Sequence, residues 1–316
     1  MRIVFMGTPD FAVHSLQALL DAREQLGLQI VGVFTQPDRP KGRGNKLQPP
    51  PVKVLAAAHG IPVYQPRRIR TESVEDMKAL APDLCVTAAF GQIISQELLD
   101  IPLHGTINVH ASLLPRHRGS APIAWSILQG DDEVGITTML TDKGIDTGDM
   151  LLQKSIARPQ KATCGELTET LGRLGAELLI ETIRQLQAGT LRPIPQNEAE
   201  MTYDPKLSRE MGVIDWSSPA RDIALQVLAL NPWPACAIPW QEGSLKLLRA
   251  EAYPGTGRPG EILAKDAKQG LVIACGADAL KIITLQAPGG KAMAASDYLR
   301  GHPLAVDNVL AFERED

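Results

Sequence analysis

The sequence predicts an α/β protein in which a mostly parallel sheet, with helices on both faces, is followed by a small antiparallel β-barrel. In the first part of the chain, short apolar runs alternate with segments of helical periodicity, which is the pattern of a parallel sheet. In the last third, short strand patterns follow one another with turn signals between them. A length of 316 residues also exceeds what one ordinary core accommodates, so two domains are expected.

The predicted elements of the first domain follow from apolar runs and from the residues that end them. The first run is short and apolar and stops at Gly7, as a buried strand does. A later segment of helical periodicity is expected to end at Gly60, since glycine is a common C-terminal signal of helices. Strands are expected at residues 2–7, 28–35, 82–91, 105–112 and 135–141, and helices at residues 10–22, 50–60, 121–130 and 164–189.

The composition and periodicity of the sequence change after the long helix predicted at residues 164–189. Residues 190–210 carry prolines and polar residues with little periodicity, which is typical of a linker. The predicted organisation is therefore a first domain over residues 1–189, a linker over 190–206 and a barrel domain over 207–316.

Composition excludes several classes of protein. A hydrophobic content of 44% indicates a globular chain, and a net charge of −4 leaves any nucleic-acid contact to local basic patches. The four cysteines lie far apart without metal-binding spacing, so reduced thiols and no metal are expected. The chain opens with a strand pattern, and no apolar run reaches membrane-spanning length. We therefore expect a cytoplasmic protein, and we expect it to be a monomer.

Two polar residues at the end of the strand at 105–112 stand out. Asn108 and His110 are two residues apart, so their side chains share one face where the strand ends. An amide is a neutral hydrogen-bond donor, and an imidazole can relay a proton near neutral pH. A strand-end asparagine is commonly a turn residue and a lone histidine is commonly a core residue, so spacing alone leaves the structural and the catalytic interpretations open.

The stretches NVHASLLP and DTGD, together with the amino-terminal MRIVFMGTPDFAV, the basic QPDRPKGRGNK and the later NPWP, resemble the methionyl-tRNA formyltransferases, within the wider family of folate-dependent formyltransferases. The resemblance runs nearly end to end. It implies a Rossmann-like catalytic domain followed by an OB-like barrel. It also implies transfer of a formyl group from 10-formyltetrahydrofolate to the amino group of the initiator methionyl-tRNA. His14 departs from the proline expected there, with little effect anticipated.

By the same resemblance, Asn108, His110 and Asp146 form the catalytic trio. Transfer between two nitrogens needs a neutral attacking amine, donors where negative charge develops, and one proton relay. Asn108 suits the donor, His110 the relay, and Asp146 the partner of a cationic imidazole. Folate contacts are expected from two segments, Ser112, Leu113, Leu114 and Pro115 in the first and Ala88, Ala89, Phe90 and Gly91 in the second.

The acceptor tRNA is expected to meet basic residues of both domains. A glycine-rich loop carries Arg39, Lys41, Arg43 and Lys46, with Arg43 as the most important contact. From residue 206 onward the chain has twelve Lys or Arg and thirteen Asp or Glu, so a tRNA surface there requires clustering. The candidates in that part are Lys206, Arg209, Lys246, Arg249 and Lys291, and Arg116, His117 and Arg118 could add positive charge beside the reactive centre.

Three other functions remain possible at this point. A formyltransferase for a small amine would share the trio but would not need the basic loop or the barrel. A tRNA-binding module with a decayed catalytic domain would not retain an intact trio. A nicotinamide-dependent oxidoreductase would be expected to carry a GxGxxG fingerprint, which the loop GTPDFA lacks.

Overall fold

The structure is a computed structural model that describes residues 1–41, 46–240, 243–266 and 268–302, without the side chains of Lys41 and Trp240. The chain divides into two compact units. Unit 1 comprises residues 1–122, 133–157 and 168–205, and unit 2 comprises residues 123–132, 158–167 and the chain from Lys206 onward. The domain boundaries drawn from the sequence remain a prediction; residues 190–205, expected to be a linker, cluster with unit 1.

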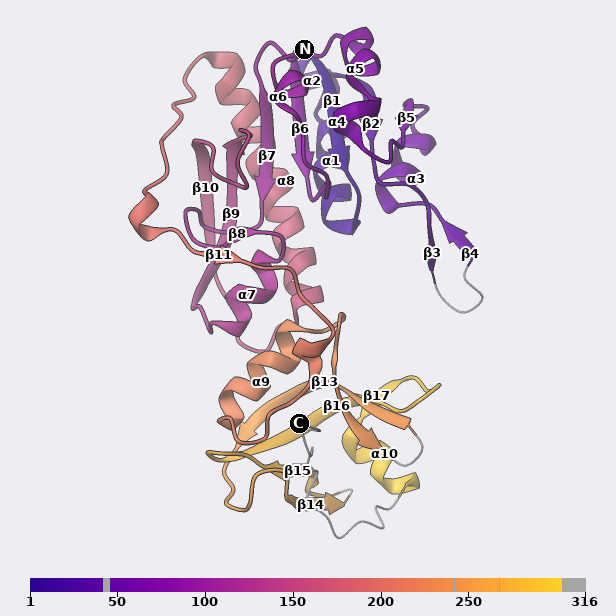
Figure 1. Ribbon diagram of the computed structural model, residues 1–316, viewed down its shortest axis with the longest axis vertical. Coiled ribbons are helices and arrows are strands. Elements are labelled where there is room, and N and C mark those ends of the chain that lie inside the picture. The colour runs from indigo at the N-terminus through magenta and orange to yellow at the C-terminus, as the bar shows by residue number, and fades with distance from the viewer. Residues whose placement is uncertain (42–45, 241–242, 267, 303–316) are drawn as a thin grey trace. The chain divides into compact units, whose positions relative to one another are not determined.

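Unit 1 is built on a seven-stranded sheet (Figure 1). Its strands are β1 (Arg2–Gly7), β2 (Gln29–Phe34), β5 (Val63–Tyr64), β6 (Leu84–Ala88), β7 (Thr106–His110), β9 (Glu133–Leu140) and β10 (Met150–Ala157). Their order across the sheet is β10-β9-β7-β6-β1-β2-β5. The five strands from β7 to β5 in this order pair in parallel, which confirms the predicted mostly parallel sheet.

Helices pack on both faces of this sheet. They are α1 (Asp10–Asp21), α2 (Arg23–Leu26), α3 (Pro51–Ala58), α4 (Ile69–Glu72), α5 (Val74–Leu80), α6 (Gln96–Leu99) and α8 (Cys164–Ala188), whose first residues belong to unit 2. Val4 and Met6 of β1 pack with apolar residues of α4, α5 and α6. On β7, a Cβ at Gly175 of α8 would lie 2.8 Å from Val109, so glycine allows this helix to approach the sheet closely.

The strand predicted at residues 135–141 is present as β9, but it runs antiparallel to β7. A helix between two strands usually produces a parallel crossover because it packs against the sheet. Here the intervening helix α7 (Pro122–Leu128) belongs almost entirely to unit 2. The chain therefore returns to the sheet in the opposite direction, and β10 pairs antiparallel with β9.

Four short strands lie outside the main sheet. β3 (Arg39–Lys41) and β4 (Lys46–Gln48) pair antiparallel, so the basic segment expected to be a loop is a hairpin in its described part. β8 (Arg118–Gly119) and β11 (Tyr203–Asp204) pair in parallel. This second pair joins the segment after β7 to the stretch predicted to be a linker.

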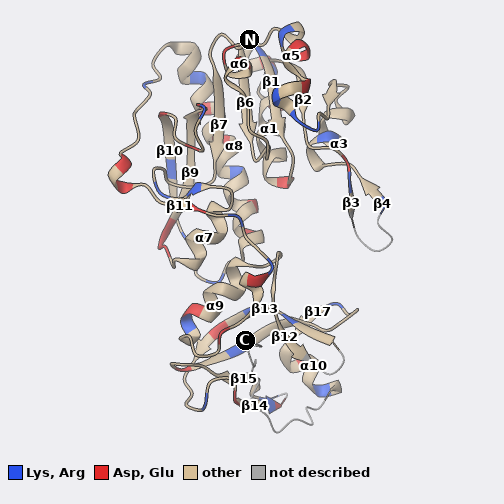
Figure 2. Cartoon of the chain, in the orientation of Figure 1, with Lys and Arg blue, Asp and Glu red and all other residues tan. Residues whose placement is uncertain are grey.

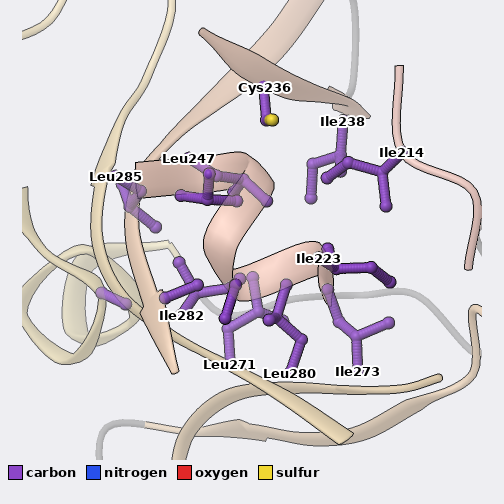
Figure 3. Packing of buried hydrophobic residues seen from close by; sticks show 14 of the residues in the cluster. Ile214, Ile223, Cys236, Ile238, Leu247, Leu271, Ile273, Leu280, Ile282 and Leu285 are labelled. Atoms are coloured by element: carbon purple, nitrogen blue, oxygen red, sulfur yellow. The ribbon is translucent and has the colours of Figure 1, made fainter. Parts of the chain in front are cut away.

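Unit 2 contains a six-stranded antiparallel sheet, as predicted for the carboxy-terminal domain. Its elements are α9 (Ala220–Ala229), β12 (Cys236–Trp240), β13 (Gly243–Tyr253), β14 (Ile262–Asp266), β15 (Gly270–Ala274), β16 (Ala279–Gln286), β17 (Ala292–Ala294) and α10 (Ala295–Gly301). The register of β13 shifts twice against β16, and such bulges bend a strand. Figure 3 shows the core, in which Ile223 of α9 packs with Ile238, Leu247 and Ile273 of the strands.

Within the described ranges, the helices lack the length of apolar sequence that a membrane span needs. The four cysteines are free, and burial raises the pKa of the Cys85 thiol to about 12. The Cys85 thiol therefore stays protonated at neutral pH.

Candidate active site

The three residues predicted to be catalytic lie together at the end of β7. Asn108 is half-buried and His110 is 6% exposed, and both belong to β7. Asp146 comes from the loop between β9 and β10. One carboxylate oxygen of Asp146, Oδ1, is 3.4 Å from Asn108 Nδ2 and 3.6 Å from His110 Nδ1. An amide, an imidazole and a carboxylate therefore converge on one point, with the carboxylate between the other two.

The orientation of the Asn108 amide is fixed by the neighbouring strand. Thr87 of β6 pairs with Asn108 across the sheet, and its hydroxyl donates to Asn108 Oδ1 at 2.9 Å. Because the oxygen of the amide is held by Thr87, the NH₂ group faces Asp146. The amide thus presents a donor, and not an acceptor, to the space beside the carboxylate.

The hydrogen bonds of His110 assign the roles of its two ring nitrogens. Nε2 lies 2.9 Å from the carbonyl oxygen of His117. A carbonyl oxygen only accepts hydrogen bonds, so Nε2 carries the hydrogen and donates it. Nδ1 is then the nitrogen that faces Asp146 and can exchange a proton. The separation of 3.6 Å from Oδ1 exceeds a hydrogen bond, so this pairing is electrostatic.

Asp146 is held by its surroundings at both its side chain and its backbone. Its Oδ2 accepts a hydrogen bond of 2.9 Å from the N–H of Gly119. Its backbone has φ of 55°, a left-handed conformation that is uncommon outside glycine. The side-chain amide of Gln196 donates to the Asp146 carbonyl at 2.8 Å and to the Gly148 carbonyl at 2.7 Å.

The segment of residues 116–118, which follows β7, carries less free positive charge than the sequence suggests. Among Arg116, His117 and Arg118, only Arg116 is exposed. His117 Nδ1 lies 2.7 Å from Asp204 Oδ2, with both side chains buried. Arg118 is 2% exposed and binds the exposed carboxylate of Glu198 through two nitrogens, and its hydrogen bond lowers the pKa of Glu198. The two buried groups therefore organise the segment and add little positive field.

The first predicted folate segment is a tightly bonded turn. Ser112 and Leu114 are buried, and Leu113 is half-buried with its side chain against Gly135 of β9. Thr137 donates to the Ser112 carbonyl at 2.7 Å and accepts from the Leu114 N–H at 3.1 Å. Pro115 is also buried. The turn is thus a rigid support beside the trio, and Leu113 is its most accessible apolar side chain.

The second predicted folate segment follows β6, the strand adjacent to β7. Ala88 and Phe90 are buried, whereas Ala89 and Gly91 are exposed with φ of 44° and 78°. The Phe90 carbonyl accepts hydrogen bonds from Thr8 at 3.1 Å and from Gln36 at 3.2 Å. The outer side of this turn therefore consists of small residues on a fixed backbone, to which a flat ring can approach closely.

The predicted tRNA residues of unit 1 lie on the β3–β4 hairpin. Arg39 donates to Gln36 at 3.3 Å, Lys46 is exposed, and the Lys41 backbone pairs with that of Lys46. Arg43 and the side chain of Lys41 lie outside the described residues. At the base of the hairpin, Asp38 binds Lys53 at 2.8 Å, and this hydrogen bond lowers the pKa of Asp38.

In unit 2, basic and acidic residues are interspersed along the chain (Figure 2). The predicted tRNA residues there differ in their exposure and in their partners. Lys206 and Lys246 are exposed, as are Arg209 and Lys291. Lys246 of β13 pairs with Gln286 of β16, which pairs with Ala292, the residue after Lys291. Lys246 and Lys291 therefore lie near the same end of β16, in or directly before the two strands that flank it there. Arg249 forms an ion pair with Glu166 and donates to the Lys161 carbonyl, so its charge is already used.

The sequence interpretation missed the residues that hold the trio in place. Thr87, Gly119, Gln196 and Asp204 were not expected to have a role at the site, and Gln196 and Asp204 lie in the stretch treated as a linker. Proline and low periodicity in that stretch indicate irregular backbone, but they do not show where its side chains bind. Among the described residues, no group of three or more His, Cys, Asp or Glu is arranged to hold a metal ion.

Comparison with known proteins places these features in a family. A family profile described as "Formyl transferase" matches residues 1–183, and one described as "Formyl transferase, C-terminal domain" matches residues 206–303. The methionyl-tRNA formyltransferase of Trichlorobacter lovleyi is 50% identical over 310 residues, covering 98% of this chain and 96% of the relative. That of Clostridium perfringens is 46% identical over 98% of this chain and the full length of the relative.

Solved structures support the fold at lower identity. The N-formyltransferase of Helicobacter canadensis, in complex with folinic acid and dTDP-3-aminofucose, has a TM-score of 0.64 at 18% identity over 89% of this chain and 98% of that chain. HypX of Aquifex aeolicus, in complex with tetrahydrofolic acid, has a TM-score of 0.63 at 19% identity; it aligns with 95% of this chain, which spans 47% of its length. From the family profiles and the near full-length relatives, this chain belongs to the formyl transferase family, among the methionyl-tRNA formyltransferases.

Proposed function

We propose that this protein transfers a formyl group from 10-formyltetrahydrofolate to the amino group of initiator methionyl-tRNA, giving N-formylmethionyl-tRNA for translation initiation. The observation that carries the proposal is the convergence of Asn108, His110 and Asp146 at one sheet end, in a chain about half identical to methionyl-tRNA formyltransferases. The folate supplies the formyl group, and the protein must bind both substrates, stabilise developing charge and move one proton.

Asn108 is proposed to stabilise the negative charge that develops on the formyl oxygen. Its NH₂ group can donate to a substrate oxygen because the hydrogen bond that it makes to Asp146 is long, at 3.4 Å, and therefore weak. Thr87 keeps the amide in the donating orientation. A preorganised donor aimed at developing charge contributes about 10²–10³ in rate in other acyl-transfer enzymes.

His110 is proposed to carry the proton. When the amine attacks, a nitrogen–carbon bond forms, the bond from the formyl carbon to the folate nitrogen breaks, and one proton must pass from the amine to that nitrogen. An α-amino group has a pKa of about 7.7–8.0, so part of it is neutral near pH 7 without a strong base. His110 Nδ1 faces the site and exchanges the proton, while Asp146 balances the charge of the imidazolium.

The donor is proposed to bind against the turn of Ala88, Ala89, Phe90 and Gly91, with Ser112, Leu113, Leu114 and Pro115 beside it. Ala89 and Gly91, which are small and exposed, and the half-buried Leu113 support this placement. The two turns follow β6 and β7, which are neighbours in the sheet, and β7 carries Asn108 and His110. A flat heterocycle seated there would hold its formyl group near Asn108.

The acceptor tRNA is proposed to meet basic residues in both units. Arg39, Lys41, Arg43 and Lys46 would act from the hairpin and Lys206 and Lys246 from unit 2, to which the neighbouring Lys291 adds charge. We further propose a catalytic domain at 1–189, a linker at 190–206 and an OB-like tRNA-binding domain at 207–316, in a monomer that acts in the cytoplasm.

The test is a formylation assay with 10-formyltetrahydrofolate and three acceptors: methionyl-tRNA, a methionyl ester and an amino sugar nucleotide. We expect kcat/KM for methionyl-tRNA to exceed the others by orders of magnitude. A preference for the amino sugar nucleotide would assign the protein to small-amine acceptors. An inactive, folded protein that still binds tRNA would instead indicate a binding module.

A further inference from the structure

Residues 196–204, here called the strap, make hydrogen bonds to the loop that carries Asp146 and to the turn that follows His110. The strap lies in the stretch that the sequence presents as a linker, and it clusters with unit 1. It contributes β11, which pairs with β8 directly after the His110 turn. The contacts of the strap lead to two members of the trio, Asp146 and His110.

The first contact is between Gln196 and the Asp146 loop. The Gln196 amide donates hydrogen bonds to two backbone carbonyls, that of Asp146 at 2.8 Å and that of Gly148 at 2.7 Å. Asp146 adopts a left-handed backbone, which an L-residue keeps only when its surroundings hold it. Gln196 bridges this residue to the second residue after it and so fixes the direction of the carboxylate.

Gln196 is itself oriented by a buried cation. The Nε of Arg118 donates to Gln196 Oε1 at 2.9 Å, and its two terminal nitrogens bind Glu198 at 3.1 and 2.7 Å. With the oxygen of the amide bound to arginine, only the NH₂ group can face the Asp146 loop. Arg118 thus selects one of the two orientations of the Gln196 amide.

The second contact of the strap leads to His110. Asp204 binds His117 Nδ1 at 2.7 Å, and the hydroxyl of Thr202 accepts the His117 N–H at 2.7 Å. His117 has φ of 60°, and its carbonyl accepts the hydrogen of His110 Nε2 at 2.9 Å. The strap therefore fixes the carbonyl that sets which nitrogen of His110 faces Asp146.

We propose that the strap is part of the catalytic machinery, and that Gln196 and Thr202 are positioning residues that set the approach of Asp146 to His110. This rests on the proposed roles of those two residues. The contacts of the strap described above are to the backbone of the Asp146 loop and to residues 117–119, and not to the Asp146 carboxylate or the His110 imidazole. Its effect is therefore expected in kcat and not in substrate binding.

The test compares Gln196→Glu, Thr202→Val and the matched control Gln187→Ala. Glutamate keeps the length of the side chain and the bond to Arg118 but cannot donate to two carbonyls. Gln187 also donates its amide to a backbone carbonyl, that of Leu26 at 2.9 Å, but it is exposed on α8. We expect kcat to fall about 10–100-fold in Gln196→Glu, because small misplacements of reacting groups have effects of this size. The KM values of Gln196→Glu for both substrates should stay near those of wild type, and Gln187→Ala should have a wild-type kcat. Thr202→Val should also lose kcat with little change in KM, but its loss should be smaller.

A double-mutant cycle with Asp146→Asn separates positioning from general stabilisation. If Gln196 acts through Asp146, Gln196→Glu should lower kcat little further in the Asp146→Asn enzyme. An equal loss in both backgrounds, or wild-type kcat in folded Gln196→Glu, overturns the proposal. The Asp146→Asn enzyme alone reports on the proposed function. Wild-type kcat there removes the catalytic role of Asp146 and the strap with it, whereas an impaired Asp146→Asn beside a normal Gln196→Glu removes only the strap.

Discussion

Replacing Thr87 by valine tests whether the orientation of the Asn108 amide matters for turnover. Valine keeps the shape of the buried threonine and removes the hydroxyl that donates to Asn108 Oδ1 at 2.9 Å. A neutral hydrogen bond of this kind contributes about 0.5–1.5 kcal/mol. At 1.36 kcal/mol per decade of rate, kcat should fall about 2–13-fold, because part of the population would present the amide oxygen to the substrate.

The size of this loss distinguishes orientation from loss of the donor itself. Asn108→Ala removes the amide, and we expect it to lower kcat about 10²–10³-fold. Thr35→Val is the matched control: Thr35 is buried just after β2, and its hydroxyl has no hydrogen-bond partner among the described residues. Initial rates at saturating substrates and thermal unfolding would be measured for all three variants. Wild-type kcat in Thr87→Val, or a loss as large as that of Asn108→Ala, would refute the reasoning.

His110→Ala should fold normally and lose about 10²–10⁴ in kcat, since it removes the proton carrier; near-normal turnover in a folded variant would contradict that role. Arg43→Ala should impair methionyl-tRNA far more than a methionyl ester, with the salt slope of tRNA binding reduced by about one unit if Arg43 contacts a phosphate. If Arg43→Ala bound tRNA as wild type does at every salt concentration, the proposed role of Arg43 in tRNA binding would be wrong. Arg118 lowers the pKa of Glu198, so their pairing stabilises the fold above the ordinary glutamate pKa of 4.5 and is lost as pH falls through the lowered value. Thermal unfolding of Glu198→Gln should therefore show less stability at pH 7 and a weaker acid dependence than wild type, and parallel pH curves would count against this linkage.

The sheet was predictable because its signals are local. The first strand ends at Gly7 and α3 is followed by Gly60 in a left-handed conformation, as the sequence indicates. The direction of β9 was not predictable, because it depends on α7 belonging to unit 2. Periodicity identifies a helix and a strand, but it does not show whether the helix packs on the sheet between them.

The site was predictable only where a motif marks it. Asn108, His110 and Asp146 stand in stretches shared with known formyltransferases, and the structure brings them together. Gln196 carries no such mark, since its partners are 50 and 48 residues away in the chain and are backbone carbonyls that any residue would supply. A contact of this kind depends on the folded backbone and leaves no residue pattern of its own.

The division of the chain into interleaved segments has a consequence for folding during synthesis. Residues 123–132 and 158–167 belong to unit 2, where Glu166 pairs with Arg249 and a Cβ at Gly130 would contact Leu225. Both segments leave the ribosome long before the strands of the unit 2 sheet. In the nascent chain they must wait without their partners, so unit 1 can assemble its sheet while unit 2 completes its core only near the end of translation. For the same reason, no single cut separates the two units, and a fragment that begins at Lys206 would lack part of the unit to which it belongs.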